Sequence, residues 1–273
     1  MNPSTPTAHA ALFDLDGVLY QGEHAVPGAP EAVAWLRTRG VPLLFITNTS
    51  SRPRQALVDK LEHIGIPAAV TDILSPPAAA TAWLQQHVTE PIGLFVTPAT
   101  IAEFAGLSIA DEATRRVGAV VIGDLGDGWD FRRLNDAFRM LMQEPKPPLL
   151  ALGMTRYWQK AGGLQLDTGP FVAALQYAAG VTARVFGKPA AEFFQAAIHR
   201  LAFPAERICM IGDDIYSDID AAQRIGLRGI LVKTGKFRAT DLDQGILPNA
   251  VLDSIADLPA WWQSHFPIPQ IFE

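Results

Sequence analysis

Four short hydrophobic runs along the chain share one design. Residues 10–13, 43–46, 183–186 and 208–211 are each followed by a polar or glycine-containing turn and then by a helical pattern. Continuous apolar strands that alternate with helices are typical of a parallel sheet covered on both faces. Ligands of such sheets bind outside the carboxyl ends of the strands. We therefore expect all four turns to lie at the same edge of one sheet.

The whole pattern predicts an α/β protein. Strands are expected over residues 10–14, 42–47, 72–74, 92–96, 119–122, 149–152, 183–186, 207–212, 228–232 and 250–252. Helices are expected over residues 29–39, 53–64, 76–88, 98–105, 130–143, 170–178, 190–201, 217–225 and 254–263. The four turns that follow the hydrophobic runs lie on both sides of residues 89–182 in the sequence. We therefore predict a doubly wound parallel sheet, Rossmann-like, over residues 1–88 and 183–273, with a smaller α/β domain over residues 89–182 inserted into it.

The amino-acid composition limits the classes of protein to which this chain can belong. The chain has 273 residues, of which 49% are hydrophobic and 18% are charged, and its formal net charge is −6. The sequence has no basic run, which argues against nucleic acid as a partner. It also has no signal-peptide pattern and no apolar stretch long enough to span a bilayer, so no membrane partner is expected. Its one cysteine, Cys209, lies inside an apolar strand, and a cytoplasmic location fits this.

The first turn carries the strongest chemical signal. Asp14 and Asp16 directly follow a buried strand and are followed by Gly17. Two carboxylates that lose water and repel each other are costly, and a bound cation would offset that cost. Gly17 would let the backbone turn tightly here. The alternative is an ordinary turn, since Asp and Gly are common turn residues.

The other three turns add the groups that such a site needs. Thr47 and Asn48 end the second run, although they could simply begin the next helix. Lys188 ends the third run and would offset the carboxylates, unless it is merely solvated. The fourth turn and the helix after it carry further carboxylates: Asp213, Asp214 and Asp218.

These four segments, in this order, resemble the motifs of the haloacid dehalogenase-like hydrolases. The long insertion before Lys188 resembles the type 2 cap of the NagD and pyridoxal phosphatase group. Within that group, residues 156–172 look most similar to the branch of phospholysine phosphohistidine inorganic pyrophosphate phosphatase and its HDHD-type relatives. The resemblance implies a Mg²⁺-dependent phosphatase acting on a small phosphorylated substrate. Relatives with this cap type often dimerise through it, which leaves a homodimer open.

The resemblance also implies a role for each motif residue. Asp14 would be the nucleophile, Asp16 the general acid and base, and Lys188 a catalytic and phosphate-binding cation. Metal ligands would be the side chains of Asp14 and Asp213 and the carbonyl of Asp16. Asp214 and Asp218 would hold metal-bound waters or orient Lys188, although Asp218 could instead only favour a helix N-terminus. Phosphate would be bound by Gly17, the Thr47 hydroxyl and the Asn48 backbone N–H.

The chain departs from the commoner pattern of that group in two places. Thr49 stands where many relatives carry a second asparagine, and residues 151–155 replace an Asn-Pro-Asp turn in the cap. Substrate assignments are therefore not inherited. Arg156 and Tyr157 lie in an expected cap loop over residues 154–163 and would contact the leaving group, or else only pack on the surface.

Two other functions remain open from the sequence. A phosphotransferase or mutase acting on phosphosugars would pass the phosphoryl group to a sugar hydroxyl instead of water. A signalling module without catalysis would keep a long-lived aspartyl-phosphate, although Asp16 and the extra domain argue against it. A dinucleotide-binding domain is disfavoured, because the first strand ends without a glycine fingerprint.

Overall fold

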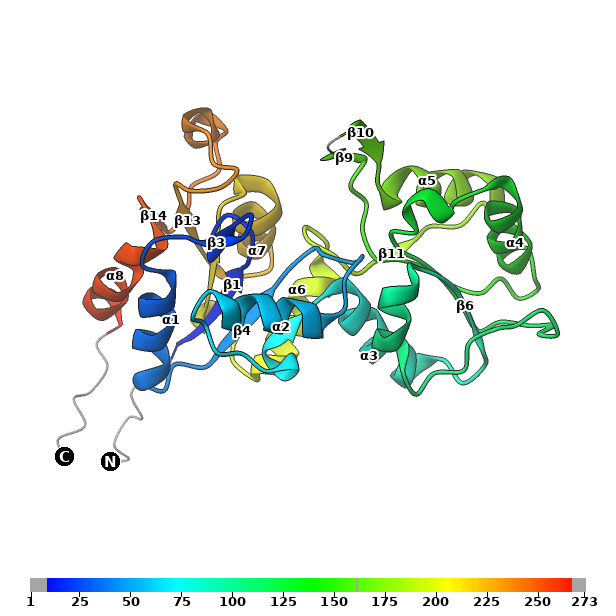
Figure 1. Cartoon of the computed structure of the whole chain (residues 1–273), viewed down its shortest axis with the longest axis horizontal. Helices are drawn as coiled ribbons and strands as arrows, with labels where there is room; N and C mark the ends of the chain where they lie inside the picture. The colour runs from blue at the N-terminus through cyan, green and yellow to red at the C-terminus, as the bar shows by residue number, and fades with distance from the viewer. Residues whose placement is uncertain (1–8, 161, 267–273) are drawn as a thin grey trace. The chain divides into compact units, whose positions relative to one another are not determined.

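The computed structural model describes residues 9–160 and 162–266, and they fall into two units (Figure 1). The first unit comprises the described residues up to 47, residues 55–74 and those from 194 onward. The second comprises residues 48–54 and 75–193. The prediction of one domain inserted into another, with boundaries at residues 88 and 183, stays a prediction.

A six-stranded parallel sheet forms the centre of the first unit. Its strand order is β14-β13-β12-β1-β4-β5. The bounds are β1 Ala10–Asp14, β4 Leu43–Ile46, β5 Ile73–Leu74, β12 Ile208–Gly212, β13 Arg228–Val232 and β14 Ala250–Leu252. From β1 the chain first adds β4 and β5 on one side and later β12, β13 and β14 on the other. The order thus reverses between β1 and β12, which is where doubly wound sheets bind ligands.

Every residue of β1 is buried, as expected for a strand covered on both faces. Ala11 and Phe13 belong to one core cluster, which contains side chains of α1, α2 and α8. A smaller cluster around Leu231 packs with the segment that follows β12. The helices of this unit are α1 Ala29–Thr38, α2 Arg54–His63, α6 Ala191–Leu201, α7 Ala221–Arg224 and α8 Leu258–His265. Of these, α2 and α6 each begin in residues assigned to the second unit.

The second unit has its own parallel sheet, in the order β11-β8-β7-β6. Its strands are β6 Ile92–Phe95, β7 Ala119–Ile122, β8 Leu149–Ala151 and β11 Arg184–Val185. Its helices are α3 Pro76–His87, α4 Phe131–Leu141 and α5 Thr168–Ala179. Apolar side chains of α4 and α5 pack on β7 and β8 in one core cluster. The α/β fold with a doubly wound core sheet and a separate smaller sheet is therefore confirmed.

One strand belongs to a different sheet than expected. Residues 183–186 were predicted to rejoin the first sheet, but β11 pairs with β8 of the smaller sheet, Arg184 opposite Leu150 and Val185 opposite Ala151. Two paired residues at a sheet edge are held by their neighbour's backbone, which a local pattern does not reveal. The turn at Lys188 therefore follows a strand of the four-stranded sheet, so the expectation of a single edge for all four turns was wrong.

Short elements complete the chain. Two small antiparallel hairpins, which the sequence pattern did not predict, join β2 Tyr20–Gln21 to β3 His24–Ala25 and β9 Tyr157–Lys160 to β10 Gly163–Leu166. Short 3₁₀ segments occupy Val70–Asp72, Pro98–Phe104, Gly126–Gly128, Ala205–Arg207, Ala239–Asp243 and Ile255–Asp257. Within the described part of the chain, no helix combines the length and the apolar character needed to cross a membrane.

Candidate active site

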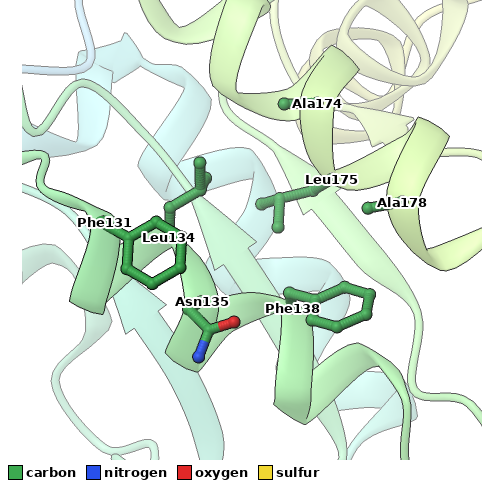
Figure 2. A pocket seen from close by; sticks show the side chains of 7 residues that line it. All are labelled: Phe131, Leu134, Asn135, Phe138, Ala174, Leu175 and Ala178. Atoms are coloured by element: carbon green, nitrogen blue, oxygen red, sulfur yellow. The ribbon is translucent and has the colours of Figure 1, made fainter.

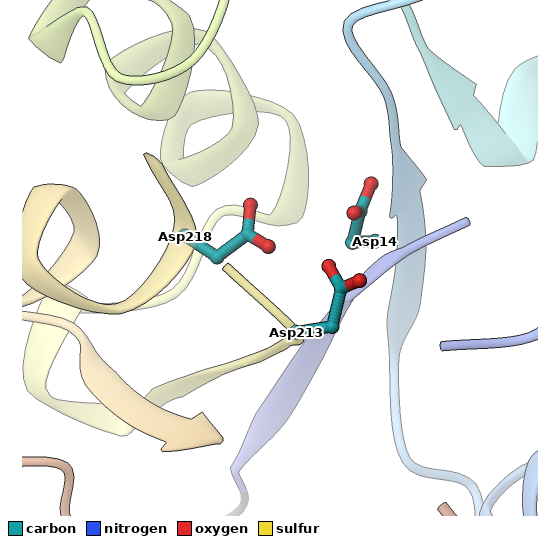
Figure 3. A group of neighbouring side chains, drawn as sticks. All are labelled: Asp14, Asp213 and Asp218. Carbon is teal, nitrogen blue, oxygen red and sulfur yellow. The ribbon is translucent and has the colours of Figure 1, made fainter. Parts of the chain in front are cut away.

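Three buried carboxylates meet at the point where the strand order of the first sheet reverses. Asp14 ends β1, Asp213 directly follows β12, and Asp218 lies in the π-helical turn Ile215–Asp220. One oxygen from each lies within 4.8 Å of the others. Figure 3 shows the three side chains turned toward a common centre. We call these residues the acidic cluster.

Strand register explains how residues so distant in sequence meet. Phe13 pairs with Ile211 between the parallel neighbours β1 and β12, so both strands deliver a carboxylate at the same edge. Gly212 admits the third, because a Cβ at this position would overlap the Asp218 carboxyl group. The sequence predicted the meeting of Asp14 with Asp213. It left Asp218 to hold metal-bound waters, to orient Lys188 or only to favour a helix N-terminus, and the structure places its carboxylate in the acidic cluster.

The donor set of the acidic cluster fits a divalent cation. Asp14 is 6% exposed, and Asp213 and Asp218 are 0% exposed. Three carboxylates buried this closely repel one another and have lost their hydration, so a positive charge between them is strongly stabilising. Carboxylate oxygens are the ligands that Mg²⁺ and Ca²⁺ prefer. The prediction of a metal site is thus supported at the level of a divalent cation.

Two glycines leave the space that the Asp213 carboxylate fills. Gly17 and Gly235 have φ values of +90° and +58°, and a Cβ on either would overlap Asp213. The Thr234 hydroxyl donates a hydrogen bond to the Gly17 carbonyl, and the Lys236 N–H donates to Asp213 at 2.6 Å. The turn after β13 and the turn after β1 therefore hold this side chain between them.

A Gly17→Ala substitution tests this packing. We expect at least tenfold weaker Mg²⁺ binding, because the added methyl group displaces the Asp213 carboxylate. Titration calorimetry measures the effect. Gly22→Ala is the matched control, since Gly22 also has a positive φ, +57°, but has open space around it. Equal Mg²⁺ affinities for the two variants would show that the close approach at Gly17 is unimportant.

Asp214 organises the turn that carries Asp218. Its side chain accepts hydrogen bonds from the N–H groups of Tyr216 and Ser217, both at 3.0 Å. Its own N–H donates to the Asp218 carboxylate at 3.3 Å. Burial alone would raise the pKa of Asp214, but these hydrogen bonds and the nearby Lys236 charge outweigh it and lower the pKa. Asp214 therefore stays ionised and holds the turn in place.

Lys236 is a cation beside the acidic cluster that no sequence motif singled out. Its Nζ lies 3.5 Å from the Asp214 carboxylate. A usable signal was present, because Thr234, Gly235 and Lys236 follow a predicted apolar strand and form a glycine turn with a basic residue. The sequence motifs offered Lys188 as the cation for the carboxylates, and Lys236 is a second one.

The remaining motif residues of the first unit lie at strand ends. The Asp16 side chain is exposed and is not among the three clustered carboxylates. The N–H of Gly17 donates to the Tyr20 carbonyl at 2.7 Å, which closes the turn after Asp16. Thr47 directly follows β4 and is 5% exposed, and its N–H donates to the Leu74 carbonyl at 3.2 Å.

In the second unit, Asn48 is joined to Lys188 by two hydrogen bonds. The Asn48 side-chain amide donates to the Lys188 carbonyl at 2.9 Å, and the Lys188 N–H donates to the Asn48 side-chain oxygen at 2.7 Å. Lys188 is 7% exposed. The sequence predicted a role for the Asn48 backbone N–H, but it did not predict this side-chain pairing, which fixes the backbone of two predicted motifs to each other.

Comparisons with known proteins agree with this geometry. Two family models match, one described as haloacid dehalogenase-like hydrolase over residues 11–109 and one as HAD-hydrolase-like over residues 185–258. Human phospholysine phosphohistidine inorganic pyrophosphate phosphatase is 38% identical over 84% of this chain and 84% of its own. The chain is a haloacid dehalogenase-like hydrolase.

Other similar proteins also belong to this family or are phosphatases. Bovine haloacid dehalogenase-like hydrolase domain-containing protein 2 is 39% identical over 86% of this chain and 88% of its own. The p-nitrophenyl phosphatase from Archaeoglobus fulgidus has 25% identity and a TM-score of 0.84, covering 93% of this chain and 99% of that one. The predicted family, the resemblance to its branch and the prediction of a phosphatase-type enzyme are confirmed.

The expected cap loop of this hydrolase is a hairpin. Residues 154–163 were predicted as a loop, whereas Tyr157 begins β9, which pairs with β10 in antiparallel fashion. Alternating side chains of a two-stranded ribbon are easily missed beside Gly162 and Gly163. Arg156 and Tyr157 are exposed, and the Arg156 guanidinium lies 5.9 Å from the centre of the Tyr157 ring. Both side chains are thus accessible to a ligand.

The second unit also contains an apolar pocket between α4 and α5, with a volume of about 240 Å³. Figure 2 shows its lining residues, of which only Asn135 is polar: Phe131, Leu134, Asn135, Phe138, Ala174, Leu175 and Ala178. None of them is titratable, so this pocket lacks the groups that phosphate chemistry requires.

Proposed function

We propose that this enzyme is a Mg²⁺-dependent phosphohydrolase that cleaves small phosphorylated substrates through an aspartyl-phosphate on Asp14. The observation that carries the proposal is the acidic cluster, whose three buried carboxylates lie within 4.8 Å of one another at the reversal of the strand order. Such a cluster is a poor site for an anion by itself and a good one once a cation is bound.

In the proposed reaction, an Asp14 oxygen attacks phosphorus and the bond from phosphorus to the leaving oxygen breaks. Asp16 donates a proton to that leaving oxygen. In the second step Asp16 removes a proton from water, whose oxygen attacks phosphorus, and inorganic phosphate leaves as the Asp14 carboxylate is restored. The bound cation would neutralise the charge that otherwise repels the two anions from each other.

Other residues are proposed to hold the ion and the phosphate. Asp14, Asp213 and the Asp16 carbonyl would hold the cation, and the position of Asp218 in the acidic cluster makes its carboxylate a candidate ligand as well. Oxygen donors of this kind suit Mg²⁺. The Thr47 hydroxyl, the Asn48 N–H and the Gly17 backbone would bind the phosphoryl oxygens, and Lys188 would add a positive charge.

Phosphate release tests the proposal. The purified protein, freed of metal with EDTA, is assayed with Mg²⁺ added back on p-nitrophenyl phosphate, pyrophosphate and phosphoramidates such as phospholysine. We expect release of inorganic phosphate that depends on added Mg²⁺. Full activity in EDTA, or a stable phosphoprotein that releases no phosphate, would overturn it. A substrate panel is needed because the human relative carries pyrophosphate and phosphoamino acids in its name.

Arg156 and Tyr157 are proposed to recognise the leaving group. A guanidinium group pairs well with anionic oxygens, which favours a charged or compact leaving group over a bulky nucleotide. Replacing both with Ala should lower kcat/KM about three- to tenfold on pyrophosphate and less on p-nitrophenyl phosphate. Tyr177→Ala is the control, since Tyr177 is 93% exposed on α5. Equal losses on both substrates, or none, would contradict this role.

The proposal also covers the location and the partners of the enzyme. A cytoplasmic location, no nucleic-acid partner and a homodimer formed through the inserted domain remain part of the proposal. The net charge of −6 supports the absence of a nucleic-acid partner.

A further inference from the structure

The turn after β13 holds Lys236 at a fixed place beside the acidic cluster. The Lys236 N–H donates to the Asp213 carboxylate at 2.6 Å. One residue earlier, Gly235 approaches Gly17 so closely that a Cβ would overlap it. The Thr234 hydroxyl bonds to the Gly17 carbonyl. The backbone that carries the Lys236 side chain is therefore attached to the site at three points.

The Lys236 ammonium group is within electrostatic range of every carboxylate there. Its Nζ lies 3.5 Å from Asp214. Its pKa is raised because burial, which would lower it, is outweighed by four carboxylates: Asp214, Asp14, Asp213 and Asp218. The side chain is nevertheless 67% exposed, so the charge also reaches solvent. A cation so placed would act on a metal ion held by the acidic cluster and on an approaching anion.

We propose that Lys236 sets the electrostatic balance of the active site, weakening the binding of the metal ion and strengthening the binding of the anionic substrate. The inference rests on the proposed function and deepens it. A positive charge 3.5 Å from the Asp214 carboxylate, in the turn that carries Asp218, repels a divalent cation and attracts a phosphate dianion. The two effects have opposite signs, which a purely structural role would not produce.

A purely structural role predicts something else. An exposed ion pair such as Lys236 with Asp214 contributes little to stability. Removing it would then leave both affinities unchanged, or would loosen the site and weaken both. Opposite changes in metal and substrate affinity therefore separate the two explanations.

The test uses the full chain with Lys236→Met, which keeps the backbone N–H that bonds to Asp213. Mg²⁺ affinity is measured by calorimetry without substrate, and KM is measured on p-nitrophenyl phosphate, both at low ionic strength. We expect Mg²⁺ to bind about three- to tenfold more tightly and KM to rise by a similar factor. Lys236→Arg, which keeps the charge, should stay within about twofold of wild type on both measures.

Lys233→Met is the matched control. Lys233 directly follows the same strand, but its Nζ pairs with Asp253 at 2.8 Å, and neither affinity should change. If wild type binds Mg²⁺ and Lys236→Met binds it equally or more weakly, the inference is overturned while the proposed function stands. If wild type binds no Mg²⁺, the proposed function is overturned together with the role that rests on it.

Discussion

Asp14→Asn should reduce phosphate release by at least about a thousandfold while leaving the fold intact. The substitution removes the proposed nucleophile and one of the clustered carboxylates together, and an amide oxygen is a poor replacement for both. Turnover on p-nitrophenyl phosphate, measured with saturating Mg²⁺, gives the result.

The stability of this variant separates chemistry from misfolding. Asp14 is one of three buried, mutually repelling carboxylates, so in metal-free buffer the variant should have a Tm at least as high as wild type. Asp59→Asn, on the exposed face of α2, is the control and should keep full activity. Retention of more than about a hundredth of wild-type turnover by Asp14→Asn would contradict the nucleophile assignment, since even general acid catalysis alone contributes 10²–10⁴-fold.

Asp16→Asn should slow turnover by about 10²–10⁴-fold without affecting metal binding. The Asp16 side chain is exposed and lies outside the acidic cluster, so only its backbone carbonyl is available to the proposed metal site. Turnover of an alkyl phosphate should fall more than turnover of p-nitrophenyl phosphate, because nitrophenolate leaves with little need for a proton. Mg²⁺ affinity by calorimetry should stay within about twofold of wild type. A large loss of that affinity would identify the Asp16 side chain as a ligand.

Several strands were predictable because each is a short apolar run with a clear end. The predicted bounds 10–14, 119–122, 228–232 and 250–252 coincide with β1, β7, β13 and β14. The strand with which each of them pairs is harder to predict. Which sheet receives β11 depends on residues more than thirty positions away in β8, and no local pattern encodes that choice.

The site was predictable where a carboxylate ends a strand. Asp14 and Asp213 follow long apolar runs, and parallel pairing brings them together. Asp218 could not be placed in the same way, because its position depends on the π-helical turn and on the missing side chain of Gly212. Lys236 was missed because basic residues after a strand are common, and only the tertiary fold brings this turn against Gly17.

The pairing of β1 with β12 also has a consequence for the synthesis of the protein. Ala10 lies beside Ile208, so the central contact of the sheet joins segments about 200 residues apart. As the chain leaves the ribosome, β1 can pair early with β4, but more than half of the sequence must be made before its second neighbour, β12, exists. Asp14 and Asp213 therefore come together only late in synthesis, and a nascent chain that ends before β12 has no acidic cluster with which to capture a metal ion.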